Sequence, residues 1–241
     1  MINEFSRTEL IIGEQNQKLL FGKHVAVFGL GGVGSYVVEA LCRSGVGHFT
    51  LVDNDAISIT NLNRQLIATH KTLGMMKTEV IKQRVIDINP KAVADIYNIF
   101  YTGASKDLFN YLDFDYMVDA IDTVSSKIML AQISQDLNVP LISCMGTGNK
   151  LDPTKLVACD IFETSACPLA KVMRKELRAR GIKKLKVVYS TEPPITPGAT
   201  DEITTNKKRC IIGSSPFVPP AAGILIASQV VKGLIDGADK A

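Results

Sequence analysis

The chain has no tryptophan, and only 6% of its 241 residues are aromatic. Its five cysteines form an odd number with no C-x-x-C pair, which argues against a disulfide framework and against a zinc site made of cysteines alone. The histidines His24, His48 and His70 lack the spacing of metal ligands, and we assign them no role. No basic stretch leads into an apolar run at the N-terminus, and the longest apolar stretch, near residues 221–231, is too short and polar to span a bilayer. We therefore expect a cytoplasmic protein without a membrane span.

The composition that remains is typical of a globular protein, with 46% hydrophobic and 21% charged residues. A chain of this length can bury roughly 70% of its unfolded surface, so it needs no disulfides for stability. The net charge is only +3, yet residues 171–186 contain eight lysines or arginines against one glutamate. The positive charge is therefore regional, and the rest of the chain is net negative.

Short apolar runs alternate with helix-like segments from about residue 24 to residue 145. The runs at 24–28, 49–52, 116–120 and 140–143 predict strands, and the spacing of apolar residues over 33–44, 72–88 and about 128–137 predicts helices. This β-α-β alternation predicts an α/β fold of Rossmann-like type, a doubly wound, mainly parallel sheet with helices on both faces.

The pattern changes after residue 144. We expect a strand over 156–162, a helix opening at Cys167-Pro168 that carries the basic residues, and a closing helix over 221–235. Residues 190–220 contain six prolines and predict a long irregular loop. No internal repeat is visible, so we expect one domain over residues 1–241, with a nucleotide-binding part at about 20–150 and a C-terminal part at about 151–241.

The sharpest motif is G-L-G-G-V-G at residues 29–34, directly after a predicted strand and at the start of a predicted helix. Glycines let the backbone turn tightly beside a phosphate, and a helix N-terminus presents unpaired N–H groups to it. Asp53 ends the next predicted strand, where a carboxylate can accept hydrogen bonds from a ribose. The same pattern serves NAD, FAD, S-adenosylmethionine and ATP, and by itself it favours a dehydrogenase. A tight turn without any ligand is the alternative.

The residues after Asp53 favour a triphosphate. The stretch V-D-N-D-A-I-S-I-T-N-L-N-R-Q contains Asn61, Arg64 and Gln65, and Lys77 follows in G-M-M-K-T-E. An arginine and a lysine that converge on this site can neutralise the β and γ phosphates as pyrophosphate departs, which a dinucleotide oxidoreductase does not need. Taken singly, each of the two cations is better explained as a solvated surface charge.

Two carboxylates follow in D-A-I-D, at the end of the predicted strand 116–120. Asp119 and Asp122 supply oxygen ligands that suit Mg²⁺ on the phosphates. Either of them is alternatively a cap of the helix that follows. The order of all these residues along the chain, rather than any one of them, indicates an adenylating enzyme.

These motifs resemble those of the ubiquitin-activating-like family of adenylating proteins, which includes the activators of the molybdopterin and thiamine sulfur carriers. The resemblance covers roughly residues 5–150 and implies that ATP binds with Mg²⁺. It assigns catalytic roles to Arg64, Lys77 and Asp122, with Asp122 near the metal. The residues that it assigns to the nucleotide are Gly29, Gly31, Gly32, Gly34, Asp53, Asp55, Asn61, Arg64, Gln65, Lys77 and Asp122. Arg7, in F-S-R-T, matches a family arginine that reaches into the neighbouring subunit's site, which implies a homodimer.

Two features of the family are missing from this chain, and their absence narrows the resemblance to one branch of the family. The sulfur-carrier activators have two C-x-x-C pairs that this chain lacks, and 241 residues leave no room for a separate cysteine domain. The chain instead resembles the branch that acts on tRNA, the threonylcarbamoyladenosine dehydratases, through R-T-E-L-I-I-G-E-Q, C-P-L-A-K-V-M-R-K-E-L-R and G-S-S-P-F-V-P-P-A-A-G. This implies an ATP-dependent dehydration and cyclisation of N6-threonylcarbamoyladenosine in tRNA through an acyl-adenylate, with no essential cysteine.

Two features of the C-terminal part have competing interpretations. Cys167 precedes Pro168 at a helix start, where the dipole favours a thiolate that forms a thioester or persulfide, but this is also an ordinary way to begin a helix. Cys42 and Cys144 are interpreted as buried fillers. The basic helix has an apolar stripe of Leu169, Val172, Met173 and Leu177. The basic residues Lys171, Arg174, Lys175 and Arg178 lie outside this stripe. They form either a candidate tRNA-binding surface or an ordinary solvated face of the helix.

Four functions are thus in competition. The leading one is the tRNA dehydratase, with a possible sulfur-transfer partner protein. The alternative that uses the same ATP site is adenylation of the C-terminal carboxylate of a small ubiquitin-like sulfur carrier. The others are a nucleotide-gated tRNA-binding scaffold and a dehydrogenase.

Overall fold

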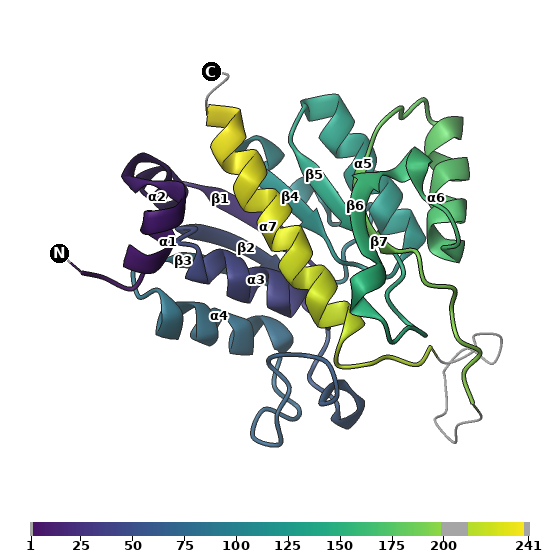
Figure 1. The fold of residues 1–241 in the computed structure, drawn as a ribbon, viewed down its shortest axis with the longest axis horizontal. Helices are drawn as coiled ribbons and strands as arrows, with labels where there is room; N and C mark the ends of the chain where they lie inside the picture. Colours follow the sequence, from purple (N-terminus) through teal and green to yellow (C-terminus); the bar gives the residue numbers. More distant parts are fainter. Residues whose placement is uncertain (1, 199–211, 239–241) are drawn as a thin grey trace.

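The computed structural model describes residues 2–198 and 212–238, and Cys210 and the polar run at 200–208 lie outside them. A seven-stranded sheet in the order β3-β2-β1-β4-β5-β7-β6 forms the centre of the molecule (Figure 1). The strands are β1 (His24–Phe28), β2 (His48–Val52), β3 (Val93–Tyr97), β4 (Tyr116–Asp119), β5 (Leu141–Cys144), β6 (Leu156–Asp160) and β7 (Lys186–Ser190). All neighbouring strands are parallel except β6, which pairs antiparallel with β7.

Helices cover both faces of this sheet. They are α1 (Ser6–Ile12), α2 (Glu14–Phe21), α3 (Gly34–Arg43), α4 (Lys77–Ile88), α5 (Val124–Leu137), α6 (Pro168–Ala179) and α7 (Val218–Ala238). One buried cluster joins the sheet to α3, α4 and α7, through side chains such as Val27, Leu51, Val37, Ile81 and Ile226. The other lies under α5 and α6 and includes Ala26, Phe28, Met117, Leu130 and Met173. Successive residues of β1 thus face opposite cores, as in a buried strand, and the predicted doubly wound α/β fold is confirmed.

The strand order determines where a ligand can bind. β1 lies between β2 and β4. After β1 the chain forms β2 and β3 on one side of it, and then returns to form β4 on the other side. In open α/β sheets this reversal leaves a crevice beyond the carboxyl ends of the two strands. The glycine turn at 29–34 follows β1, Asp53 follows β2, and the D-A-I-D motif ends β4, so the topology brings all three to one place.

Some elements differ from the sequence prediction. Helix α4 begins at Lys77 rather than at residue 72, because Gly74 has a φ of +81° and residues 72–76 turn back to pair with Ala56 and Ile57. Strand β3 was not predicted, since it lies at the sheet edge and its V-A-D-I-Y pattern is half exposed. Strand β7 and the helices α1 and α2 were missed as well, because they are short and adjoin charged segments. The predicted strand 156–162 ends at Asp160, whose carboxylate caps a 3-10 turn.

The closing helix α7 is longer than predicted. By length and composition alone it is the one helix among the described residues that could cross a membrane. Its buried side chains pack into the core against α3, and Figure 1 shows α7 crossing the front of the sheet beside that helix. The side chains that α7 buries include Val218, Ala222, Ile226, Ala227, Val230 and Leu234.

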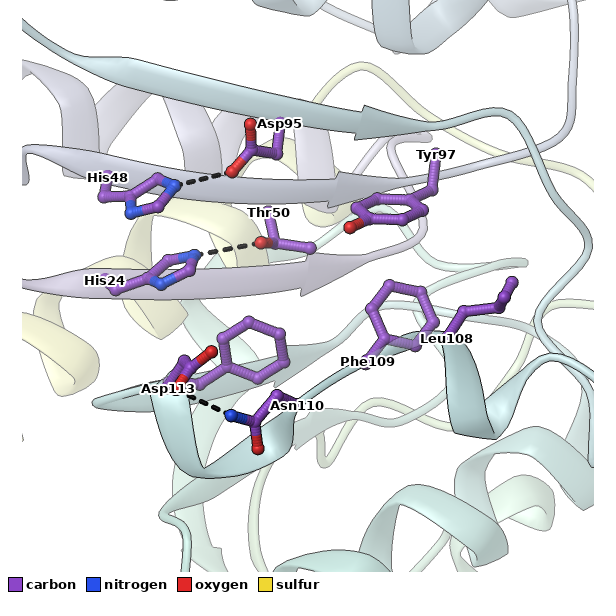
Figure 2. A pocket seen from close by; sticks show the side chains of 10 residues that line it. His24, His48, Thr50, Asp95, Tyr97, Leu108, Phe109, Asn110 and Asp113 are labelled. Atoms are coloured by element: carbon purple, nitrogen blue, oxygen red, sulfur yellow. Dashed lines mark hydrogen bonds and ion pairs between the residues drawn. The ribbon is translucent and has the colours of Figure 1, made fainter.

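A cavity of about 380 Å³ lies between strands β1–β3 and the segment around residues 108–114 (Figure 2). On its wall the rings of His24 and His48 stack at 3.5 Å between centroids with 8° between their planes. His24 Nε2 lies 2.9 Å from Thr50 Oγ1, and His48 Nε2 lies 2.7 Å from Asp95 Oδ2. The nitrogen lone pairs of two stacked rings lie in parallel planes and do not converge on one point. This pair of histidines is therefore not suited to chelating a metal. No group of three or more His, Cys, Asp or Glu residues in the described part of the chain has the geometry of a metal site.

Burial, and secondarily the adjacent His48, lowers the pKa of His24 below its usual 6.5. The unfolded chain therefore takes up a proton at this position before the folded protein does, and the free energy of unfolding falls as pH decreases through about 6.5. Because a single proton is taken up, this histidine changes the free energy of unfolding by at most about 1.4 kcal/mol per pH unit. We predict that His24→Gln loses less stability than the parent between about pH 7.5 and about pH 5.5 in urea unfolding. The exposed His70→Gln variant is the control and keeps the parental pH dependence; an unchanged slope in His24→Gln contradicts the assignment.

Candidate active site

The glycine turn is pressed against the turn that follows β4. Gly29 has a φ of +90°, and a Cβ there would lie 2.6 Å from the Ala120 carbonyl oxygen. A Cβ at Gly34 would lie 1.8 Å from the Gly29 carbonyl oxygen. Side chains are therefore excluded at both positions. Helix α3 begins here without a side-chain cap, so its N-terminus is available to a phosphate.

Asp53 joins the glycine turn to the start of the next crossover. It is buried, its Oδ2 accepts a hydrogen bond from the Leu30 N–H at 2.7 Å, and its Oδ1 accepts one from the Asp55 N–H at 2.8 Å. Lys77, the first residue of α4, is also buried and places Nζ 2.6 Å from Asp55 Oδ2 and 3.8 Å from Asp53 Oδ1. The lysine thus faces inward at the crevice, beside a carboxylate of Asp55 that is 58% exposed.

Arg64 and Gln65 lie against the glycines from the other side. A Cβ on Gly32 would lie 3.2 Å from Arg64 Cγ, while Arg64 Nη1 donates to the Thr60 carbonyl at 3.0 Å. Gln65 is buried, with Nε2 3.7 Å from the Cβ position of Gly31. Its Oε1 has no hydrogen-bond partner among the described residues. A buried carbonyl oxygen left without a donor is what a ligand that carries an N–H or O–H group would satisfy.

Asn61 closes the short 3-10 helix η1 (Ile59–Asn61) in front of these two residues. Its Oδ1 accepts a hydrogen bond from the Ser58 N–H at 3.1 Å, and its backbone oxygen accepts bonds from Arg64 and Gln65. In this structure Asn61 therefore shapes the turn that presents Arg64 and Gln65. Its predicted contact with phosphate stays a prediction.

The two carboxylates of D-A-I-D have separate environments. Asp119 is fully buried, its Oδ2 lies 2.9 Å from Lys127 Nζ, and the Ser143 hydroxyl also donates to it. The expectation that Asp119 supplies a carboxylate to Mg²⁺ is therefore wrong, because Lys127 neutralises it out of reach of solvent. Asp122 is exposed and does not cap α5, whose N-cap is Thr123.

Arg7 is not brought to this site within its own chain. It lies exposed on α1, next to Phe5, whose ring packs against Phe21 of α2 at 5.2 Å. Phe21 in turn reaches Gly45, just beyond the C-terminal end of α3. The glycine turn is at the opposite end of that ten-residue helix, about 15 Å away.

Helix α6 presents part of the predicted basic surface. Lys171, Lys175 and Arg178 are exposed, and the Arg178 guanidinium lies 5.0 Å from the centroid of the Phe162 ring. Arg174 is instead half-buried, and its Nη1 donates to the Thr164 carbonyl at 2.9 Å and to the Thr164 hydroxyl. The interpretation of Arg174 as a free surface cation is wrong, since it ties α6 to the preceding turn.

The apolar stripe of α6 also differs from its prediction. Met173 and Leu177 are buried and Leu169 is partly so, but Val172 is 46% exposed. Ala170 takes the place of Val172 in the core, because it lies three residues before Met173 on the same face.

Burial raises the thiol pKa of three of the four cysteines among the described residues, Cys42, Cys144 and Cys159. Burial raises the pKa of both Cys42 and Cys144 to about 12, which fits their interpretation as fillers. Cys167 is the N-cap of α6, and its Sγ accepts from the Ala170 N–H at 3.5 Å. It is 4% exposed, so it is poorly accessible to a partner thiol.

Two buried lysines were missed by the sequence analysis. Lys127 is one, and its spacing was a usable signal, since it lies three and four residues before the buried Leu130 and Ala131 on one face of α5. Lys150 is the other, and its Nζ donates to the backbone oxygens of Ser190 and Glu192 at 3.0 and 2.6 Å. Burial lowers the pKa of Lys150. Nothing in the local sequence G-T-G-N-K marks this side chain as buried.

Comparisons with known proteins agree with this geometry. A model of the ThiF family matches residues 5–240. The tRNA threonylcarbamoyladenosine dehydratase of Bacillus subtilis (strain 168) is 42% identical, over 98% of this chain and 96% of its own length. A crystal structure of the Escherichia coli enzyme of that name, TcdA, in complex with ATP has a TM-score of 0.89 at 31% identity, covering 98% of this chain and 96% of that one.

A more distant relative matches a smaller part. The adenylyltransferase and sulfurtransferase UBA4 of Vanderwaltozyma polyspora is 30% identical, over 62% of this chain and 35% of its own length. The dehydratase matches, by contrast, extend through the C-terminal part with the basic helix. The predicted resemblance is thus confirmed, and the chain belongs to the ThiF family.

Proposed function

We propose that this protein is an ATP-dependent tRNA threonylcarbamoyladenosine dehydratase. The observation that carries the proposal is the similarity to the Bacillus subtilis dehydratase over 98% of the chain, at 42% identity. The geometry supports it, because the glycine turn, Lys77 and the unpartnered oxygen of Gln65 surround the same crevice. The E. coli relative that binds ATP has the same fold over nearly its full length.

The reaction balances without any group outside ATP and tRNA. The carboxylate of the threonylcarbamoyl group attacks the α phosphate, the bond to the β phosphate breaks, and pyrophosphate leaves. A nucleophilic oxygen or nitrogen of the same substituent then attacks the activated carbonyl, loses its proton to solvent and expels AMP. The tRNA nucleoside has then lost one water. Because both groups belong to one substituent, ring closure is intramolecular and needs no cysteine relay.

The roles of the site residues follow from their places. The uncapped N-terminus of α3 and the glycines receive the α phosphate, and Asp53 receives the ribose. Lys77 and Arg64 neutralise the charge that develops on the departing pyrophosphate, which requires Arg64 to release its present hydrogen bonds. Asp122 is the carboxylate that fits Mg²⁺, since it is exposed just beyond the carboxyl end of β4, whereas Asp119 is occupied by Lys127.

The proposal treats both parts of the chain as one domain, since β6 and β7 of the C-terminal part belong to the same sheet as β1–β5. It includes a homodimer, because Arg7 lies on α1, whose neighbour Phe5 packs near the end of α3 remote from the glycine turn, and a neighbouring chain can supply the arginine. It includes a cytoplasmic location, in keeping with the free state of the four described cysteines. We also propose a sulfur-transfer partner protein, on grounds independent of the structural features described above.

The first prediction concerns the reaction. Purified protein, ATP and tRNA carrying threonylcarbamoyladenosine are expected to yield AMP, pyrophosphate and a nucleoside lighter by one water, measured by mass spectrometry. Lys77→Met removes a cation that acts as pyrophosphate leaves, so AMP formation falls by about 100-fold or more. Lys82→Met, on the next turn of the same helix, serves as the control and keeps the parental rate. AMP formation that requires a protein ending in Gly-Gly, rather than tRNA, would instead establish the sulfur-carrier alternative.

The second prediction concerns tRNA. Neutralising the exposed cations Lys171, Lys175 and Arg178 with glutamine is expected to weaken tRNA binding about tenfold or more at low salt and to flatten its salt dependence. ATP affinity stays unchanged because α6 lies outside the crevice. The control carries the same change in net charge elsewhere on the surface, at Lys82, Lys91 and Lys106. Equal losses in the two triple variants would place the tRNA surface elsewhere.

The third prediction tests whether Arg7 acts in the neighbouring site. Arg7→Ala and Lys77→Met homodimers are each expected to be nearly inactive. After unfolding and refolding together, half of the dimers are mixed, and each mixed dimer contains one site with both residues intact. The mixture therefore recovers about a quarter of the parental AMP formation. An inactive mixture, in which exchange has been verified by mass, means that Arg7 acts in the site of its own chain, and an active Arg7→Ala homodimer means that it acts in neither site.

A further inference from the structure

A fully buried ion pair lies directly behind the candidate site. The side chains of Lys127 and Asp119 are both 0% exposed, with Nζ 2.9 Å from Oδ2. Lys127 also donates to the Cys144 carbonyl at 2.8 Å and to Ser143 Oγ at 3.2 Å. The three donors of the ammonium group thus have three acceptors, one on β4 and two on β5.

Such a pair is weak evidence for stability. Removing two charges from water costs several kcal/mol per ion, and a well-packed apolar pair of similar volume is often equally stable. Its distinctive property is directional, because an ammonium group with three partners fixes the relative positions of the groups that it bonds. Here it joins helix α5 to the carboxyl ends of two neighbouring strands.

The pair controls the turn that carries Asp122. Asp119 Oδ2 is held by Lys127, and its Oδ1 accepts a hydrogen bond from the Ile121 N–H at 3.1 Å. The Ala120 carbonyl of the same turn is the group that approaches Gly29 too closely for any side chain. A line of direct contacts therefore leads from Lys127 through Asp119 to the wall of the glycine turn and to Asp122.

We propose that Lys127 is a positioning residue, which acts through Asp119 to place the 120–122 turn for the departure of pyrophosphate. The inference rests on the proposed function. The glycine turn has independent anchors, since Gly29 N–H donates to the Val52 carbonyl and Leu30 N–H donates to Asp53. A loosened 120–122 turn thus affects the transition state that uses Asp122 more than the binding of ATP.

The least disruptive variant removes a single hydroxyl group from the network. Ser143→Ala deletes the bond to Asp119 and the acceptor for Lys127 without leaving an unpaired charge. We expect kcat for AMP formation to fall about fivefold or more, with KM for ATP within about twofold. The matched control is Ser126→Ala, also buried and one residue before Lys127, whose hydroxyl donates to the Tyr101 carbonyl at 2.6 Å. It loses a comparable buried hydrogen bond, and its kcat stays at the parental value.

A second variant removes both charges. Lys127→Met/Asp119→Asn leaves no buried ion unpaired and keeps an acceptor for the Ile121 N–H. We expect it to fold, as judged by circular dichroism and gel filtration, and to lose about 20-fold or more in kcat while still binding ATP. If either this variant or Ser143→Ala is folded and turns over at the parental rate, the positioning role is overturned.

A measurement without turnover separates this inference from the proposed function. Hydrogen exchange of the Ile121 amide is expected to be about fivefold or more faster in Ser143→Ala than in the parent or in Ser126→Ala. If the parent forms no AMP from the modified tRNA, the proposed function fails while the exchange result still tests the control of the turn. Unchanged Ile121 exchange in both network variants overturns the inference on its own.

Discussion

The site depends on a steric constraint between two turns. The glycine turn after β1 and the 120–122 turn after β4 approach so closely that a single methyl group on Gly29 would collide with the Ala120 carbonyl. The turn that carries Asp122 therefore lies directly against the glycine turn that precedes helix α3. Because β1 and β4 are neighbours with their carboxyl ends at one edge of the sheet, the strand order brings the two turns together. The glycines allow the turns to lie this close.

The charges around this crevice are divided between buried and exposed positions. Lys77 is held inward beside Asp53 and Asp55, whereas Asp122 is exposed to solvent. The C-terminal part contributes differently, through a sheet extension and a helix whose exposed cations lie away from the crevice. This division suits an enzyme that holds a small triphosphate firmly and a large polyanion over a wide surface.

Much of the fold, and the grouping of the glycine turn, Asp53 and Lys77 at one place, was predictable from local patterns. The strand β1, the glycine turn and the helix α3 form a continuous unit whose periodicity and glycines agree, so the strand was placed without error. The failures have physical reasons. Asp119 and Asp122 are equivalent in a sequence motif, and only the packing of α5 reveals that one of them is neutralised by Lys127. Arg174 and Val172 were misplaced because a charge run shows that a helix is amphipathic but leaves its rotation uncertain by one position. Strand β3 lacks the continuous apolar run of a strand that is buried on both faces, because it is at the sheet edge.

The unpartnered oxygen of Gln65 has a consequence for the protein in the cell. A buried carbonyl without a donor raises the free energy of the empty protein by about 1–3 kcal/mol, and a ligand that supplies the donor removes this penalty. Occupancy of the crevice then lowers the population of partially opened molecules, which are the ones that proteases cleave.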